Sequence, residues 1–229
     1  MKKLTIHSET VYVLSIIILA FSVAMVASAD FGLSMIVAPA YILSQKLGFI
    51  TFGQAEYLIQ GVLFISFLIA VRKFKPTYLF AFLTCVIYGL CLDLFRLIPI
   101  LNPNVVAPGS MDLWLRIVFF IVGELLTTFS IALCFRTYLY PQVVDFFVVG
   151  ITAHFKLNRG KFKCINDICF LVVSIVLSLC FFGKLIGIYY GTIVLTLING
   201  PLISLFGNLI DRCFFIKPLF PKFATFFEI

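Results

Sequence analysis

Glu124 is an acidic residue in the middle of a long apolar run, Leu113 to Phe135. In a transmembrane helix, a carboxylate at that depth costs about 2.5–3.5 kcal/mol on insertion scales, so such acids are usually neutral or face a partner in the protein interior. A proton, a cation or a polar group of a substrate would suit this position. The alternative is a structural hydrogen bond to a neighbouring helix. Glu124 is the first candidate for a substrate or ion pathway.

A second candidate is the Asn199-Gly200-Pro201 tripeptide, which interrupts an apolar run near the end of the chain. Proline removes one helical hydrogen bond and clashes with the preceding turn, so the tripeptide predicts a break in the helix. Carbonyl groups freed at a break can bind a cation or a substrate. They also occur at ordinary kinks.

Asp93 and Arg96 lie three residues apart near the end of another apolar run and could form an ion pair on one helical face. A functional pair and a solvated pair near the membrane surface both fit this spacing. Both residues are therefore weaker pathway candidates.

Two apolar pieces, residues 35–47 and 142–153, are too short to cross a bilayer. If they re-enter the membrane, polar groups at their ends must line a cavity, because lipid cannot satisfy free hydrogen-bonding groups. Asp30 and Ser34 in the first half, and Asp145 in the second, would then face the pathway. The alternative is a pair of amphipathic helices lying flat at the membrane surface.

Enzyme signatures are missing from the sequence. His7 and His154 are the two histidines, and there is no HExxH motif, GxSxG motif or phosphate-binding loop. None of the seven cysteines forms a CxxC pair. The chain is therefore expected not to be an enzyme, with no catalytic residues, cofactor or metal site.

The composition indicates which elements must hold these residues. Of 229 residues, 62% are hydrophobic and 12% are charged, and the mean hydropathy is +1.16. A soluble domain is about one quarter charged. Runs of about 20 apolar residues, the length of a membrane span, recur along the chain. Six spans are expected, at residues 11–29, 54–71, 78–97, 113–135, 165–182 and 190–210.

Two local similarities indicate an internal duplication. Residues 21–25 resemble residues 129–133, and residues 89–95 resemble residues 200–206, at offsets of 108 and 111 residues. The halves would be residues 1–110 and 111–229, each with three spans and one short piece. Because three is an odd number, the second half would enter the membrane from the opposite side, giving the inverted repeats common in secondary transporters. The predicted fold is an all-α polytopic membrane protein of this kind.

The basic residues predict the orientation. With both termini in the cytoplasm, thirteen of the 17 lysines and arginines fall in inside segments. They form short clusters between apolar runs rather than one basic face, so nucleic acid is not an expected partner.

Three stretches carry a resemblance to a known group. They are Ala29-Asp30-Phe31-Gly32-Leu33-Ser34 after the first span, Thr51-Phe52-Gly53 before the second, and the glycine-containing ends of the third and sixth. They resemble the YczE-like bacterial membrane proteins, which are related to the YitT-like proteins. The second half departs from that pattern at Leu139-Tyr140-Pro141-Gln142. The resemblance implies a topology and the bacterial cytoplasmic membrane, and no substrate.

The expected function is that of a transporter-like protein for a small molecule or ion. Two alternatives remain open: a substrate-binding subunit of a larger importer, like the S components of energy-coupling-factor transporters, or a membrane partner that assists assembly or sensing. The expected partners are the lipid bilayer, a small-molecule or ion substrate, and a second copy or a partner subunit.

Overall fold

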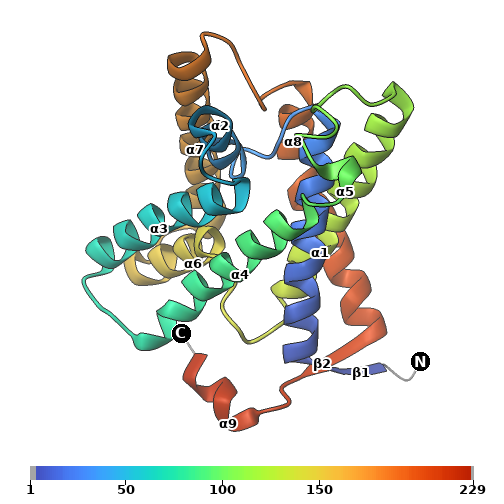
Figure 1. Ribbon diagram of the computed structural model, residues 1–229. Coiled ribbons are helices and arrows are strands. Elements are labelled where there is room, and N and C mark those ends of the chain that lie inside the picture. Colours follow the sequence, from blue (N-terminus) through green and yellow to red (C-terminus); the bar gives the residue numbers. More distant parts are fainter. Residues whose placement is uncertain (1–3, 228–229) are drawn as a thin grey trace.

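The computed structural model describes residues 4–227 and is helical apart from two short strands (Figure 1). The strands are β1 (Leu4–His7) and β2 (Phe214–Lys217). The helices are α1 (Ser8–Ala29), α2 (Ala38–Leu47), α3 (Phe52–Val71), α4 (Leu79–Phe95), α5 (Leu113–Cys134), α6 (Val143–Phe155), α7 (Arg159–Phe182), α8 (Tyr190–Cys213) and α9 (Pro221–Ala224), with 3₁₀ turns at Pro76–Tyr78, Pro99–Leu101 and Thr225–Phe227.

Six of the described helices are long and apolar enough to cross a bilayer: α1, α3, α5, α7, α8, and α4 together with the turn that precedes it. Large apolar side chains cover their outer surfaces, as Val62, Ile69 and Leu197 show with exposures of 66%, 70% and 71%. Such a surface is stable in lipid and unstable in water. The predicted all-α membrane fold with six long helices is confirmed.

The helices follow the same order in both halves of the chain. A long helix, a short helix and two long helices make up α1 to α4, and the same order makes up α5 to α8. The predicted start of the fifth span was wrong, because α7 begins at Arg159 rather than Ile165. Asn158 caps this helix by accepting a hydrogen bond from the Lys161 backbone amide at 3.0 Å, so the basic residues form its first turns.

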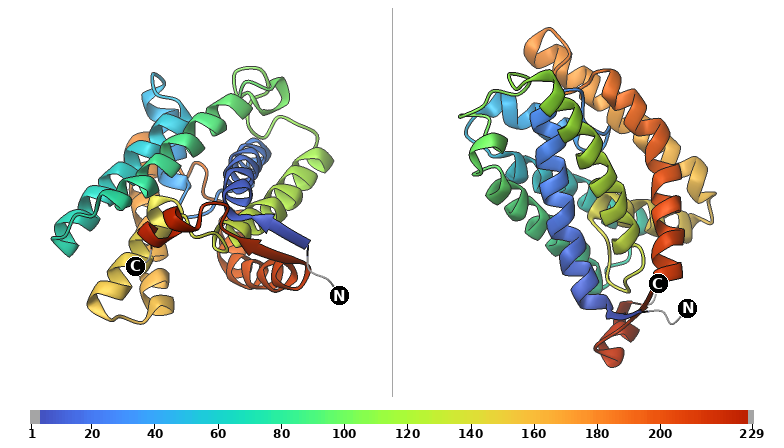
Figure 2. Two further views of the ribbon diagram at one scale, coloured as in Figure 1. Left: turned by 90° about the horizontal axis from the view of Figure 1, so that it is seen from below. Right: turned by 90° about the vertical axis from the view of Figure 1, so that its right-hand side faces the viewer.

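The most extensive helix contact joins the antiparallel pair α1 and α5, which lie side by side in Figures 1 and 2. Helix α4 packs on α1, and α8 packs on α5. The short helices α2 and α6 each pack against both α3 and α7, which are the second long helices of the two halves. Exchanging the two halves therefore reproduces most of the helix contacts.

The largest difference between the halves concerns one helix pair. Helices α3 and α4 pack closely, and a Cβ placed on Gly53 would lie 2.0 Å from the Gly89 carbonyl oxygen. Only glycine permits this approach. Within the described residues, the corresponding helices α7 and α8 are not a packed pair.

A strand near the start of the described chain pairs with a strand near its end. Strands β1 and β2 form a parallel ladder in which Leu4 lies opposite Phe214 and His7 opposite Lys217. Both ends therefore lie on the same side of the helices (Figure 2), as an even number of spans requires. This ladder was not expected from the sequence.

Candidate functional site

Glu124 lies inside the bundle, where α5 meets α1. Its neighbour Gly123 allows this contact, since a Cβ at residue 123 would lie 2.7 Å from Val26 Cγ2. One turn further along, the Thr127 hydroxyl donates to Ser22 Oγ at 2.8 Å. The tight α1–α5 interface leaves Glu124 only 4% exposed.

The partner of Glu124 comes from α8. When the Asn199 amide is oriented to satisfy both groups, its nitrogen donates to Glu124 Oε1 and to the Leu195 carbonyl oxygen, the latter at 3.1 Å. The structure thus brings together two of the predicted site residues. No lysine, arginine or histidine within residues 4–227 forms an ion pair with Glu124. The carboxyl group is buried with an amide partner and without a counter-charge.

The predicted break at residues 199–201 was wrong. Helix α8 runs without interruption from Tyr190 to Cys213, with Pro201 inside it. Proline deprives the Leu197 carbonyl of its helical donor, while the remaining hydrogen bonds of the helix hold. A Cβ on Gly200 would meet no atom within 4 Å, so the surroundings of residues 200 and 201 are open.

Asp145 belongs to a separate polar group between α6 and α7. Its carboxylate lies 3.8 Å from Lys163 Nζ, and the same nitrogen lies 3.8 Å from Asp167. Burial raises the pKa of Asp145, and the Lys163 ammonium partly offsets this effect. Asp145 shares no hydrogen bond or ion pair with Glu124 or Asn199 among the described contacts.

The predicted ion pair between Asp93 and Arg96 does not form among the described residues. Asp93 instead accepts hydrogen bonds from the Gly53 amide at 2.8 Å and from the Thr51 hydroxyl at 2.5 Å. The Arg96 guanidinium lies over the Phe52 ring at 5.2 Å. Both side chains hold the amino end of α3, where a carboxylate is favoured by the helix dipole.

Asp30 and Ser34 lie in the segment that leads from α1 to α2. Asp30 ends α1 in the left-handed conformation, with φ +54°, and the carbonyl of Ser34 accepts from the Ala38 amide at 3.0 Å. Arg116 donates to the carbonyl oxygens of Ala29 and Asp30 at 2.8 and 3.1 Å. Burial raises the pKa of Asp30, and Arg116 partly offsets the change. Asp30 therefore lies in a helix-capping arrangement.

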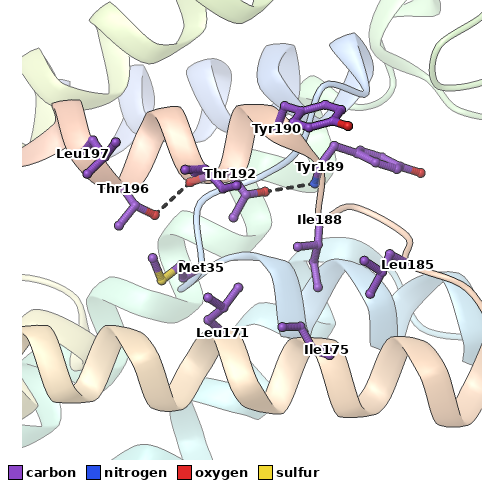
Figure 3. A pocket seen from close by; sticks show the side chains of 11 residues that line it. Met35, Leu171, Ile175, Leu185, Ile188, Tyr189, Tyr190, Thr192, Thr196 and Leu197 are labelled. Atoms are coloured by element: carbon purple, nitrogen blue, oxygen red, sulfur yellow. Dashed lines mark hydrogen bonds between the residues drawn. The ribbon is translucent and has the colours of Figure 1, made fainter.

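A pocket of about 550 Å³ separates α7 from α8, close to the loop that joins them. Figure 3 shows Leu171 and Ile175 of α7 facing Thr192 and Thr196 of α8, with Met35 between them. The Thr192 hydroxyl accepts from the Tyr189 amide at 3.4 Å, and Thr196 donates to the Thr192 carbonyl at 2.8 Å. The pocket is thus mainly apolar, and its few polar groups lie on α8.

The polar groups on α8 continue toward Glu124. Thr192, Thr196 and Asn199 are spaced by four and three residues, so they lie on the same side of the helix. Asn199 is partly exposed, whereas Glu124 behind it is buried. Asn199 thus lies within about one helical turn of the part of α8 that lines the pocket, on the side of the helix that carries Thr192 and Thr196.

Sequence reasoning missed a second buried acid. Glu56 lies near the start of α3, where an acid is ordinarily in contact with water, but it is 2% exposed and accepts from Gln60 Nε2 at 3.2 Å. Gln60 also donates to Gln142 Oε1 at 3.1 Å. The available signal was the four-residue spacing of Glu56 and Gln60, which places two polar side chains on one face of an apolar helix.

Comparison with known proteins gives a family and no activity. No curated protein and no solved structure shows significant similarity to the chain. Residues 6–208 match the family described as "Family of unknown function (DUF6198)", a region that includes all six long apolar helices except the last residues of α8. The chain belongs to the DUF6198 family.

Proposed function

We propose that this protein is a transporter-like membrane protein for a small molecule or ion, with the Glu124–Asn199 pair on its pathway. The observation that carries the proposal is a buried carboxyl group, within a span, that has an amide partner and no counter-charge. Ionisable groups inside spans characteristically mark substrate and ion pathways or proton relays. We place the protein in a bacterial cytoplasmic membrane, with both termini in the cytoplasm.

Corresponding glycines in the two halves support the same proposal, provided that the halves are inverted repeats. Thr51 caps α3 and Asn158 caps α7, and each cap is followed two residues later by a glycine, Gly53 or Gly160. The partner of Gly53 is Gly89, whose counterpart in the predicted duplication is Gly200. Both glycines of the second half are open: Gly200 has no neighbour within 4 Å, and Gly160 has only its own cap, Asn158.

The two halves would then hold equivalent helix pairs in different arrangements. Helices α3 and α4 are closed at Gly53 and Gly89, and α7 and α8 are separated by the pocket. Inverted-repeat transporters expose a central site to alternate sides by moving one helix group against another. We propose that α7 closes onto α8 at Gly160 and Gly200, which would seal the pocket beside the Glu124–Asn199 pair.

A second candidate is a substrate-binding subunit of a larger importer, or a membrane assembly partner. The observation that favours it is the exposure of α7 and α8, where 17% of the residues in the apolar stretch of each helix are buried, against 56% in α1. A partner subunit could cover this surface. Recovery of a stoichiometric ATPase or other subunit with the mildly solubilised protein would favour this candidate.

The proposal can be tested by a thermal-shift screen of the detergent-purified protein against inorganic ions and small polar metabolites. A ligand at about 100 times its Kd should stabilise the folded state by roughly 2.7 kcal/mol. We expect at least one ligand to stabilise the wild type and the Asp112→Asn variant, which changes an exposed acid next to α5, but not Glu124→Gln.

Either of two results would contradict the proposal. One is a ligand that stabilises the Glu124→Gln variant as strongly as the wild type. The other is a screen in which nothing shifts the wild type and Glu124→Gln only lowers its melting temperature, which would assign Glu124 a structural role.

A further inference from the structure

A second buried polar cluster lies away from the Glu124–Asn199 pair, where α3 meets the amino end of α6. It consists of Glu56 and Gln60 of α3 and Gln142, the residue before α6. Glu56 and Gln60 are 2% and 1% exposed. Helices α3, α4 and α6 also form a hydrophobic core that is rich in aromatic side chains, including Phe64 and Phe146.

The hydrogen bonds of this cluster are incomplete. Gln60 Nε2 donates to Glu56 Oε2 at 3.2 Å and to Gln142 Oε1 at 3.1 Å, which uses both of its hydrogens. Three buried atoms have no partner: Glu56 Oε1, Gln60 Oε1 and Gln142 Nε2. Two of the three are acceptors that lack a donor. Buried groups of this kind are rare, because each costs about 1–3 kcal/mol.

None of the ion pairs of residues 4–227 includes Glu56, so its carboxyl group has no positively charged partner in this part of the chain. Cys85 and Tyr88 of the neighbouring helix α4 interact electrostatically with Glu56, and both are buried and uncharged near neutral pH. The Tyr140 hydroxyl, in the segment before α6, is buried and has no partner of its own. An ionised Glu56 would thus be a buried charge with one hydrogen bond, which is strongly unfavourable.

We propose that Glu56 is a proton-binding site, and that the side chains of Gln60 and Gln142 are built around its protonated form. A proton from water adds to Glu56 Oε1, which turns an acceptor into a donor. The neighbouring Gln60 Oε1 is the acceptor that lacks this donor. One proton therefore removes the charge and gives both unpartnered oxygens a hydrogen-bond partner.

The proton also links two helices. Gln60 holds Gln142 at the start of α6, so the protonation state of Glu56 acts on the contact between α3 and α6. After proton loss, the carboxylate would need a further donor, and Gln142 Nε2 is the unpartnered donor in the cluster. This site is distinct from the Glu124–Asn199 pair, and its occupancy by a proton does not depend on a transported substrate.

The test is infrared spectroscopy of the purified protein at neutral pH, which detects the carbonyl stretch of a protonated carboxylic acid. The wild-type spectrum minus the Glu56→Gln spectrum should contain this band. Glu124→Gln is the matched control, since it removes the other buried acid and should leave the Glu56 band in place. In Gln60→Leu the band should persist at a shifted frequency, because the hydrogen-bond acceptor is lost.

Two results would overturn the proposal. The first is a difference spectrum without the acid band at neutral pH, which would show that Glu56 is ionised. The second is a melting temperature that rises in sodium chloride relative to choline chloride in the wild type but not in Glu56→Gln, which would identify a metal-cation site. If Glu56→Gln does not fold, the frequency shift in Gln60→Leu decides the question: a band unchanged from wild type would contradict the proposal.

Discussion

At the scale of single residues, the charged side chains have two different uses. Arg116, Asp93 and Arg96 lie at helix ends, where they satisfy backbone groups or cover an aromatic ring. Glu56 and Glu124 lie within spans and have amide partners. A charge at a helix end is stabilised by the helix dipole and by water, whereas an acid inside a span has neither. The two buried acids are therefore the residues to which function is assigned.

Arg116 gives a prediction for the first group. Its two hydrogen bonds to carbonyl oxygens at the end of α1 and its position 4.5 Å over the Phe31 ring are lost in Arg116→Ala. We expect the variant to lose about 2–3 kcal/mol of stability, the contribution of hydrogen bonds to a charged group. Thermal unfolding in detergent measures this loss, and Lys73→Ala, which removes an exposed charge, is the control. Equal melting temperatures for the two variants would show that Arg116 does not hold α1.

Residue types indicated Glu124 and Asn199 as separate candidates but not that they form a pair. An acid in one apolar run and a polar tripeptide in another were both recognised as unusual, and the α5–α8 contact brings them together. Glu56 was missed because position near a helix start normally means contact with water. The four-residue spacing of Glu56 and Gln60 was a local signal, but it could not reveal Gln142, which is far away in the sequence and accepts a hydrogen bond from Gln60. The prediction of an Asp93–Arg96 pair was wrong for a similar reason. The two side chains instead contact Gly53 and Phe52 of α3, which are far away in the sequence.

At the scale of elements, the apolar runs predicted the six long helices, because a span must be both long and apolar. They also predicted α2 and α6, which are apolar but too short to cross a bilayer. The pairing of β1 with β2 could not be predicted, since it joins segments more than 200 residues apart through backbone hydrogen bonds. The continuity of α8 also differed from expectation. Proline weakens a helix at one hydrogen bond, and the helix breaks only where the surroundings offer the freed groups other partners.

Two glycines give a matched prediction for the helix pairs. A Cβ on Gly89 would lie 2.7 Å from the Gly53 carbonyl oxygen and 3.0 Å from Tyr57, so Gly89→Ala should destabilise the protein by about 1–3 kcal/mol. A Cβ on Gly200 meets nothing within 4 Å, and Gly200→Ala should be neutral or up to about 1 kcal/mol more stable. Thermal unfolding of both variants under the same conditions compares them directly. Equal destabilisation by the two substitutions would contradict the asymmetry between the α3–α4 and α7–α8 pairs.

At the scale of the whole molecule, the antiparallel helices α1 and α5 join two similar sets of helices, with α4 packed on α1 and α8 packed on α5. The largest difference between the sets is that the first is closed at a glycine contact and the second contains a pocket. Glu124 and Asn199 lie on the side of the open pair, and Glu56 lies on the side of the closed pair. This arrangement is the reason to propose a pathway that opens and closes between α7 and α8.

The measurement that tests this proposal most directly is a cross-link between α7 and α8 in native membranes. Cys164 follows Gly160 by four residues, as Tyr57 follows Gly53, and Tyr57 contacts Gly89. If α7 closes onto α8, Cys164 and a cysteine introduced by Gly200→Cys should meet and form a disulfide under mild oxidation. The same variant carrying Cys164→Ala controls for the remaining cysteines and should give no such product. We predict a cross-link between Cys164 and residue 200; no cross-link, although thiol reagents modify both cysteines, would contradict closure of α7 onto α8.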